Sequence, residues 1–388
     1  MVKNETGLIS PLEDKFAGCL VGGAIGDGLG TSTEGRTPQE IRDRFGGRVE
    51  DFAPPFGTKP DGRHKGDGNI SDDTLMVLAL CRAHLAKGGQ LDSHDMATYF
   101  LHEIVDKPIW IPEYQREQPL VERLFYPEKY LLIRLRLASI NPREAGIGNM
   151  VNCGAAMYAA PVGMMNAGDA DAAYLRAVNI FSAHQYSYGL EAAALMAACI
   201  AEALRPNATV NSIVDVALRL SKDGTHTALE AVVAAARSAS GDESQIQEHL
   251  RAAIEPYDTI KGGVQEFERA GAYASQLHAI EEFPIALAYL IVSGGDFKQA
   301  VLGSINYGRD SDSIASMVGA IIGAMVGKRA LPQYWTHEIG VRNRIDFDQA
   351  AGDMYALFQR DYQDAYQKAQ HRYKELMSLS QAEGVQND

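Results

Sequence analysis

The sequence has few cysteines and no apolar run long enough to cross a membrane. Its 388 residues include 4 scattered cysteines, which lie among apolar or small residues without any Cys-x-x-Cys pair: Cys19, Cys81, Cys153 and Cys199. Such usage is typical of buried, reduced thiols. The most apolar run, 314–327, is too short to span a bilayer, and residues 1–10 lack the apolar segment of a signal peptide. We therefore expect a cytoplasmic protein.

Positive charge is also scarce. Lysine and arginine together number 36 against 50 acidic residues, which gives a formal net charge of −14. This balance argues against nonspecific affinity for nucleic acid or for anionic membrane surfaces. It leaves room for a local basic pocket that holds a small phosphorylated ligand. We expect neither nucleic acid nor a membrane among the partners.

Sustained alternation of apolar and polar residues, the pattern of a strand, is rare, and no strand–helix–strand order appears. Apolar residues recur at helical spacing instead. The sequence predicts an all-α, single-domain, multi-helix fold at 11–370, followed by a polar C-terminal tail at 371–388. The loop-rich segment 31–69 is expected to be functional. Segment 107–118 is expected to be irregular, and 241–263 to contain a connection.

Two acidic clusters each open an apolar helical segment. Residues 310–313 read Asp-Ser-Asp-Ser before the run 314–327, and residues 71–74 read Ser-Asp-Asp-Thr before a helix expected to stop at Gly88. Buried carboxylates are costly unless a cation is paired with them. For 71–74 the simpler alternative is an N-cap with acids in the first helical turn. We hypothesise that the clusters meet around hard metal ions, because oxygen ligands favour Mg²⁺, Mn²⁺ or Ca²⁺.

Other segments allow a ligand-binding interpretation beside a structural one. The small-residue segment 145–165 suits a turn that presents backbone amides to a ligand, or a close helix–helix contact. His184 lies at an expected helix junction, where it could bond a ligand or cap a helix. The glycines in 26–30 could suggest a phosphate loop, but no strand precedes them and no Gly-Lys-Ser/Thr follows. A nucleotide loop is therefore disfavoured.

In their order along the chain, these motifs resemble those of the ADP-ribosylglycohydrolase family, which includes the dinitrogenase reductase-activating glycohydrolases. The resemblance extends from Phe16 to Gly327. It rests on Gly22-Gly23-Ala24-Ile25-Gly26-Asp27-Gly28-Leu29-Gly30 with Glu34, on Ser71-Asp72-Asp73-Thr74, on Asn152-Cys153-Gly154-Ala155-Ala156-Met157 with Pro161 and Gly163, on His184, and on Asp310-Ser311-Asp312-Ser313-Ile314-Ala315. The last motif is the most specific.

The resemblance implies an orthogonal helical bundle with a binuclear Mg²⁺ or Mn²⁺ centre. The implied metal ligands are Ser71, Asp72, Asp73, Asp310, Asp312 and Ser313. The implied catalytic residues are Glu34, Asp72, Asp73 and Asp310. The implied substrate-binding residues are Asn152, Gly154, Ala155, Met157, His184 and Arg309. The expected activity is hydrolysis of a ribosyl N- or O-glycosidic bond, in an ADP-ribosylated protein or a small ribosylated molecule.

The sequence departs from the family pattern at several positions. Ser71 and Ser313 stand where threonine is usual and keep the hydroxyl group. Tyr158 replaces a common arginine and Arg309 a common glycine, which bears on the substrate more than on the metal site. Segment 106–148 lacks a motif that carries a catalytic acid in some members, and Asp106 is the nearest candidate for that acid.

Two other classes of protein remain alternatives. One is a non-catalytic member of the family, in which the metal only stabilises a binding or structural protein. The other is a phosphohydrolase that uses the same two-metal chemistry and releases phosphate. A hydrolase of a small ribosylated metabolite or nucleoside is a variant of the main hypothesis. Retention of oxygen ligands in both acidic motifs argues against a non-catalytic protein.

Overall fold

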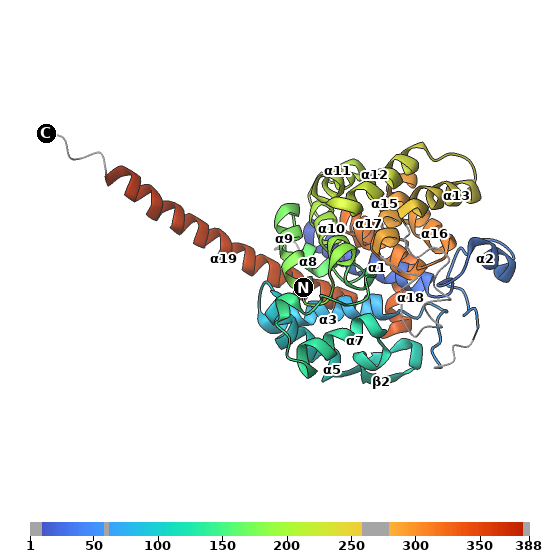
Figure 1. Cartoon of the computed structure of the whole chain (residues 1–388), viewed down its shortest axis with the longest axis horizontal. Coiled ribbons are helices and arrows are strands. Elements are labelled where there is room, and N and C mark those ends of the chain that lie inside the picture. Colours follow the sequence, from blue (N-terminus) through green and yellow to red (C-terminus); the bar gives the residue numbers. More distant parts are fainter. Residues whose placement is uncertain (1–9, 58–61, 258–278, 383–388) are drawn as a thin grey trace.

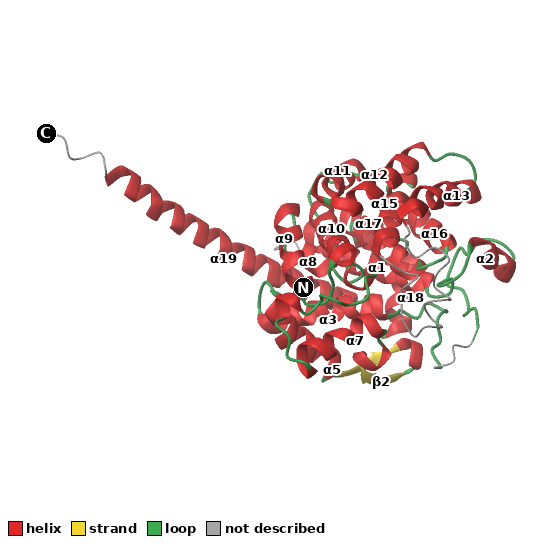
Figure 2. Ribbon diagram, viewed as in Figure 1, coloured by secondary structure: helices red, strands yellow, loops and turns green. Residues whose placement is uncertain are grey.

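The computed structural model describes residues 10–57, 62–257 and 279–382. Helices dominate, and the only strands among these residues form one short antiparallel pair, β1 (Pro108–Ile111) and β2 (Arg116–Pro119) (Figure 2). The predicted all-α fold is confirmed. Residues 258–263 of the expected connection and 383–388 of the expected tail lie outside the described residues.

Two helices form the centre of the bundle, α1 (Pro11–Gly30) and α17 (Ser311–Val326). The two helices run antiparallel with their backbones in contact, because glycines lie where they meet. A Cβ at Gly22, for example, would clash with the Gly319 carbonyl. A helix that is apolar on all sides is buried in this way. At the far end of the contact a Cβ on Gly30 would lie 2.5 Å from the Cα of Asp312. Glycine therefore brings the end of α1 directly against the start of α17.

Helix α3 (Asp72–Lys87) has the boundaries that its sequence predicts. The Ser71 side chain accepts a hydrogen bond from the backbone N–H of Asp73, and Gly88 ends the helix in the left-handed conformation with a φ of 82°. A serine N-cap and a glycine after the last turn are the usual helix signals. The second acidic motif is therefore held at a helix N-terminus.

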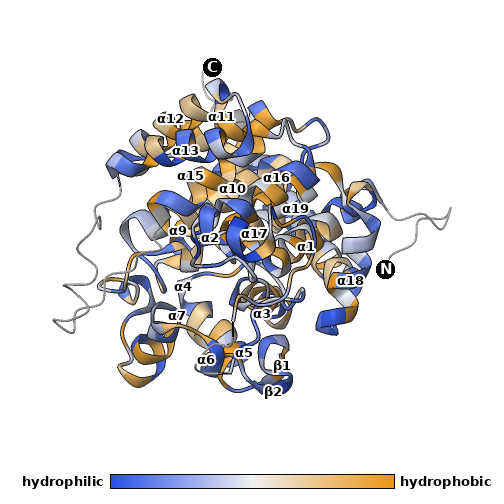
Figure 3. Cartoon of the chain, turned by 90° about the vertical axis from the view of Figure 1, so that its right-hand side faces the viewer, coloured by the Kyte–Doolittle hydropathy of each residue, from blue (hydrophilic) through white to orange (hydrophobic). Residues whose placement is uncertain are grey.

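The other helices surround this core, with α11–α13 on one side of it and α3, α5 and α7 on the other (Figure 1). Hydrophobic colours concentrate on central helices such as α10 and α15, whereas α2 is mostly hydrophilic (Figure 3). Their bounds are α2 (Pro38–Phe45), α4 (Ser93–Asp95), α5 (Leu101–Val105), α6 (Leu120–Arg123), α7 (Tyr126–Leu131), α8 (Ala160–Met164), α9 (Ala170–Phe181), α10 (Ser187–Ala203), α11 (Val210–Leu220), α12 (Asp223–Ser238), α13 (Glu243–Ile254), α15 (Ala279–Val292), α16 (Phe297–Tyr307), α18 (Gln333–Asn343) and α19 (Phe347–Ala382).

Three segments hold more regular structure than their sequences predict. The loop-rich segment 31–69 contains α2, and the irregular segment 107–118 forms the β1–β2 hairpin. Segment 241–263, which is expected to contain a connection, begins in the link between α12 and α13 and then continues as helix α13. Asp242 and Gln245 form a capping box at its start, a signal that the surrounding polar sequence conceals.

Helix α19 leaves the body of the protein and extends beyond it (Figure 1). It crosses position 370 without interruption, so the boundary of the expected tail stays a prediction. In the described ranges, no helix combines the length and hydrophobicity that crossing a membrane requires.

Candidate active site

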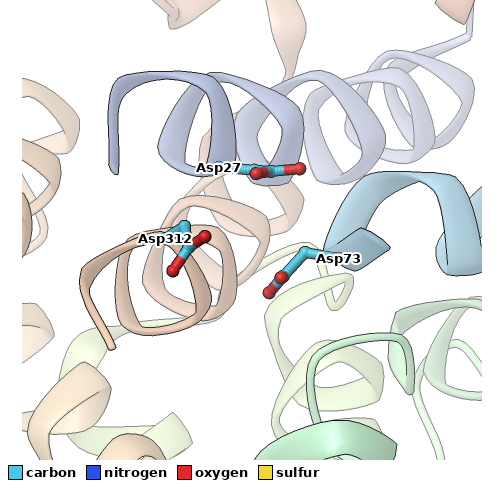
Figure 4. Close-up of side chains that lie close together, drawn as sticks. All are labelled: Asp27, Asp73 and Asp312. Atoms are coloured by element: carbon cyan, nitrogen blue, oxygen red, sulfur yellow. The ribbon is translucent and has the colours of Figure 1, made fainter. Parts of the chain in front are cut away.

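The structure brings the two acidic motifs together at the junction of α1, α3 and α17. Carboxylates of Asp27, Asp73 and Asp312 converge from these three helices, with one oxygen of each within 4.8 Å of the others (Figure 4). Glu34, Asp310 and Asp312 form a second group of the same dimensions. Asp312 belongs to both groups. The arrangement is therefore a pair of adjoining acidic groups that share one carboxylate.

Asp27 holds the start of α3 against the end of α1. Its carboxylate accepts hydrogen bonds from the Ser71 N–H at 3.0 Å, and from the Thr74 N–H and hydroxyl at 3.1 and 2.6 Å. Burial, followed by the charge of Asp312, raises the pKa of Asp27 to about 7 in spite of these bonds. Asp27 is the only charged residue between Phe16 and Gly30, and this isolation in an apolar helix is the signal that could have identified it.

The start of α17 is fixed to α1 by hydroxyl groups. Ser311 donates to the Gly30 carbonyl at 3.0 Å and lies 2.9 Å from the Thr33 hydroxyl. Next to it, the Cys153 thiol donates to Asp310 at 3.0 Å. Burial and the neighbouring charge of Asp312 raise the pKa of Asp310 well above its usual value. Burial and the neighbouring charge of Asp27 likewise raise the pKa of Asp73 well above its usual value.

Two buried cations border the carboxylates. The Lys65 ammonium contacts Glu34 and lies 3.3 Å from Asp312. Burial by itself lowers the pKa of Lys65, but the charges of Asp312 and Glu34 raise it above its ordinary value, so the ammonium stays charged. Arg123 Nη1 lies 2.7 Å from Asp72, and the same guanidinium binds Glu113. Lys65 comes from a loop and Arg123 from the end of the short helix α6, and no recognised motif contains either residue.

The carboxylate groups fit a hard divalent cation. All their donors are oxygen, the ligand type that Mg²⁺ and Mn²⁺ prefer. Asp73 Oδ1 is buried without a hydrogen-bond partner among the described residues. Five carboxylates converge here, and Lys65 compensates only part of their charge: Asp27, Glu34, Asp73, Asp310 and Asp312. Buried like charges of this density favour the binding of a cation.

A pocket of about 330 Å³ opens from the carboxylates. Its lining combines acidic residues with aromatic and apolar side chains. The lining residues are Glu34, Asp72, Asp73, Phe125, Tyr126, Pro127, Glu128, Met150, Asn152, Cys153, Gly154, Met157, Asp310, Asp312 and Ser313. Its size and mixed lining are typical of a small-molecule site.

Most of the residues expected at the site line this pocket, but four do not. Ser71 lies beneath it and donates to Asp73 at 3.0 Å, whereas Ala155 is buried behind the wall. His184 is buried between the Tyr158 hydroxyl at 2.9 Å and the Pro127 carbonyl at 3.1 Å, and burial lowers its pKa to about 4. A neutral histidine in these contacts supports the pocket wall.

Arg309 and Asp106 also lie away from the pocket. Arg309 forms an ion pair with Glu281 at 2.7 Å and lines a separate hollow. Asp106 is partly exposed and is bound by Arg136 at 2.6 Å. The structure therefore does not place either side chain beside the carboxylate cluster.

The acid from segment 106–148 that does line the pocket is Glu128. Its Oε2 has no hydrogen-bond partner in the described parts of the chain, and its Oε1 accepts a long bond of 3.4 Å from Asn152. Burial and the nearby Asp72 raise the pKa of Glu128 to about 7. A Cβ on Gly154 would clash with this carboxylate, so glycine there leaves room for it. The sequence pointed to Asp106 because Glu128 lies in no recognisable motif.

Comparison with known proteins identifies one family whose model matches nearly the whole chain. The model of the ADP-ribosylglycohydrolase family matches residues 9–364. Human ADP-ribosylhydrolase ARH3 is 25% identical over 357 residues, which cover 89% of this chain and 94% of the human protein. The ADP-ribosyl-[dinitrogen reductase] glycohydrolase of Rhodospirillum rubrum is 23% identical over 347 residues, covering 89% and 97%.

A solved structure supports the fold independently. The chain aligns with an ADP-ribosylglycohydrolase-related protein complex at a TM-score of 0.59 and 20% identity, covering 90% of this chain and 100% of the other. The family match extends over both acidic motifs and the pocket wall between them. The chain therefore belongs to the ADP-ribosylglycohydrolase family, whose members hydrolyse glycosidic ADP-ribose linkages, and it is a glycosidase.

Proposed function

We propose that this protein cleaves the bond between the anomeric ribose carbon and the leaving group of an ADP-ribosylated substrate, with two divalent cations in the carboxylate cluster. The observation that carries the proposal is the pair of adjoining acidic groups sharing Asp312, at the end of a pocket that also contains Glu128. The proposed ligands are Ser71, Asp72, Asp73, Asp310, Asp312 and Ser313, with Glu34 and Asp27 beside them. The family's general use of divalent metals supports this assignment.

Bound Mg²⁺ or Mn²⁺ would supply a Lewis acid that orients the ribose hydroxyls and a water molecule. Glu128 lines the same pocket and is suited to donate a proton to the leaving group, since its carboxyl has a free oxygen and a pKa of about 7. Carboxylates such as Asp72 stabilise the positive charge that develops at the anomeric carbon. Arg123 holds Asp72 in place for this role.

The alternatives fit the site less well. A phosphohydrolase would use the same two metal ions, but the buried cations beside them offer a phosphate no further contact, because carboxylates engage both Lys65 and Arg123. A binding protein without activity would not need a buried carboxyl with a free oxygen, such as that of Glu128, facing the pocket. The exposed aromatic side chains of Phe125 and Tyr126 can accept either a nucleotide base or a smaller aglycone. Both an ADP-ribosylated protein and a small ribosylated molecule are therefore candidate substrates.

A substrate panel tests the proposed reaction. The purified protein is incubated with Mn²⁺ and arginine-linked or serine-linked ADP-ribosyl peptides, and separately with small ribosylated compounds. We expect release of free ADP-ribose or ribose from at least one of them, measured by chromatography. Release of inorganic phosphate without free sugar would instead support the phosphohydrolase alternative. Stoichiometric binding of ADP-ribose with no turnover of any compound would support the non-catalytic one.

Lys65 is expected to limit the affinity of the site for metal. Its ammonium contacts Glu34 and Asp312, so it competes with a divalent cation for the same oxygens. Lys65→Met should tighten Mn²⁺ binding about tenfold or more by isothermal titration calorimetry, because a buried charge near the ion is removed. Lys107→Met is the control, since Lys107 is half-exposed and pairs with the distant Glu103. Weaker binding in Lys65→Met would show that the lysine supports the site.

A further inference from the structure

Glu113 is a buried partner of Arg123 that the proposed reaction leaves without a role. Both of its carboxylate oxygens meet the guanidinium: Arg123 Nε contacts one, and Nη2 donates to the other at 3.0 Å. Both side chains are 0% exposed. A two-point contact of this kind is among the strongest and most directional that an arginine forms. Glu113 therefore fixes the position of Arg123 and compensates its charge.

The β1–β2 hairpin holds Glu113 at this place, on the same side of the body as α5 and α7 (Figure 1). Glu113 lies in the turn Pro112–Tyr114 between the strands, and helix α6, which ends at Arg123, packs on both strands. The Glu113 carbonyl also accepts a hydrogen bond of 2.9 Å from the N–H of His64, the neighbour of Lys65. One residue of the hairpin thus contacts both segments that carry the buried cations of the site.

The contact between Arg123 and Asp72 is of a different kind. Arg123 Nη1 lies 2.7 Å from Asp72 Oδ1, but it has no partner in hydrogen-bond geometry among the described residues, so charge holds this pair together. Burial by itself lowers the pKa of Arg123, but the charges of Asp72 and Glu113 raise it, so the guanidinium stays charged. One cation therefore lies between two carboxylates, and of these Asp72 lines the pocket.

We propose that Glu113 is a positioning residue for the metal centre, because it neutralises Arg123 and leaves the charge of Asp72 available to a divalent cation. The inference rests on the proposed function, in which Asp72 is a metal ligand. Without a carboxylate at position 113, the full charge of the buried guanidinium would act on Asp72. Arg123 would then compete with the divalent cation for the same carboxylate.

Titration of the metal-free protein with Mn²⁺ tests this role without any substrate. Glu113→Gln keeps the shape of the side chain and removes its charge, so we expect the dissociation constant for Mn²⁺ to rise about tenfold or more. Glu103→Gln is the matched control, because Glu103 is also a buried carboxylate that pairs with two cations, one of which is Arg82 at 2.9 Å. Arg82 lies about 15 Å along α3 from Asp72, so the control should bind Mn²⁺ like the wild type.

A double variant separates charge compensation from a merely structural role. Glu113→Gln combined with Arg123→Met removes both members of the buried pair, so it leaves no unpaired cation and can be measured even if Glu113→Gln alone unfolds. We expect its Mn²⁺ affinity to lie within about threefold of the wild type, because the two positions again carry no net charge. Affinity in the double variant as low as in Glu113→Gln, or lower than the wild type by tenfold, would overturn the proposal.

The wild-type titration distinguishes a failure of this inference from a failure of the proposed function. If the wild type binds Mn²⁺ and Glu113→Gln binds it equally well, this inference alone is overturned. If the wild type binds no Mn²⁺, the metal centre of the proposed function is rejected and this inference with it. Circular dichroism of each variant, compared with that of the wild type, shows that the titrated protein is folded.

Discussion

Asp312→Asn is expected to abolish metal-dependent hydrolysis while making the metal-free protein more resistant to heat. Asp312 is the carboxylate shared by both acidic groups, so its loss removes a ligand from each. We expect at least a 1,000-fold fall in kcat/KM, because metal activation and substrate positioning are lost together. Calorimetric titration should show no tight Mn²⁺ binding.

The gain in stability follows from the electrostatics of the site. Burial and the neighbouring charge of Glu34 raise the pKa of Asp312. When folding raises the pKa of a carboxyl, that group destabilises the native state at every pH above its pKa in the unfolded chain. In that range the unfolded chain ionises the carboxyl freely, whereas the folded chain must either bury its charge or bind a proton. Each pKa unit of such a shift lowers the free energy of unfolding by about 1.4 kcal/mol. Asparagine has the same shape but no charge, so it does not destabilise the native state in this way.

Asp27→Asn is the matched comparison for this result. Asp27 accepts hydrogen bonds from Ser71 and Thr74, and an asparagine amide offers one acceptor oxygen where the carboxylate offers two. The pKa of Asp27 is also raised, to about 7, so in Asp27→Asn the removal of a buried charge and the loss of hydrogen bonds oppose each other. We expect the melting temperature of metal-free Asp27→Asn to change less than that of metal-free Asp312→Asn, which rises by a few degrees. If both variants melted below the wild type and Asp312→Asn kept its turnover, the cluster would be a structural network and not a metal centre.

Glu128→Gln is expected to lower kcat by about 100- to 1,000-fold without weakening Mn²⁺ binding. General acid catalysis is worth about this much, and glutamine keeps the shape of the side chain but cannot transfer a proton. Because the pKa of Glu128 is about 7, wild-type kcat should decline as the pH rises above that value, when the acid form is lost. This decline should be absent from the variant.

Asp106→Asn is the control for the Glu128 experiment. Asp106 is the acid that the sequence favoured, but it is partly exposed and bound by Arg136. Its substitution should leave kcat and the pH profile unchanged. A large loss of kcat in Asp106→Asn, with Glu128→Gln fully active, would return the catalytic role to the residue that the sequence indicated.

The fold was predictable because its signals are local. The scarcity of period-two alternation excluded a large sheet, and Ser71 and Gly88 marked the ends of α3. Helix α13 in 241–263 was not expected because the segment is mostly polar, although Ile246, Leu250 and Ile254 recur at helical spacing and Asp242 and Gln245 form a capping box. The arrangement of the helices in space depends on long-range contacts, such as the approach of α1 to α17.

The candidate site was predictable only in part for the same reason. The acidic motifs were recognisable because polar groups at the start of buried helices are unusual. Lys65 and Arg123 reach the carboxylates from segments with no helical pattern, so only the folded chain shows the contact. For His184 and Arg309, motif position suggested a ligand contact, whereas in the structure His184 contacts the Pro127 carbonyl and Arg309 pairs with Glu281.

The dependence of sugar release on metal tests the central claim most directly. The protein is stripped with a chelator, dialysed and assayed for release of free ADP-ribose from an ADP-ribosylated peptide that the wild type cleaves. We predict that the stripped protein is inactive, that Mg²⁺ or Mn²⁺ restores turnover, and that titration requires two ions per chain. Full turnover by the stripped protein, with no metal detected by mass spectrometry, would contradict the account.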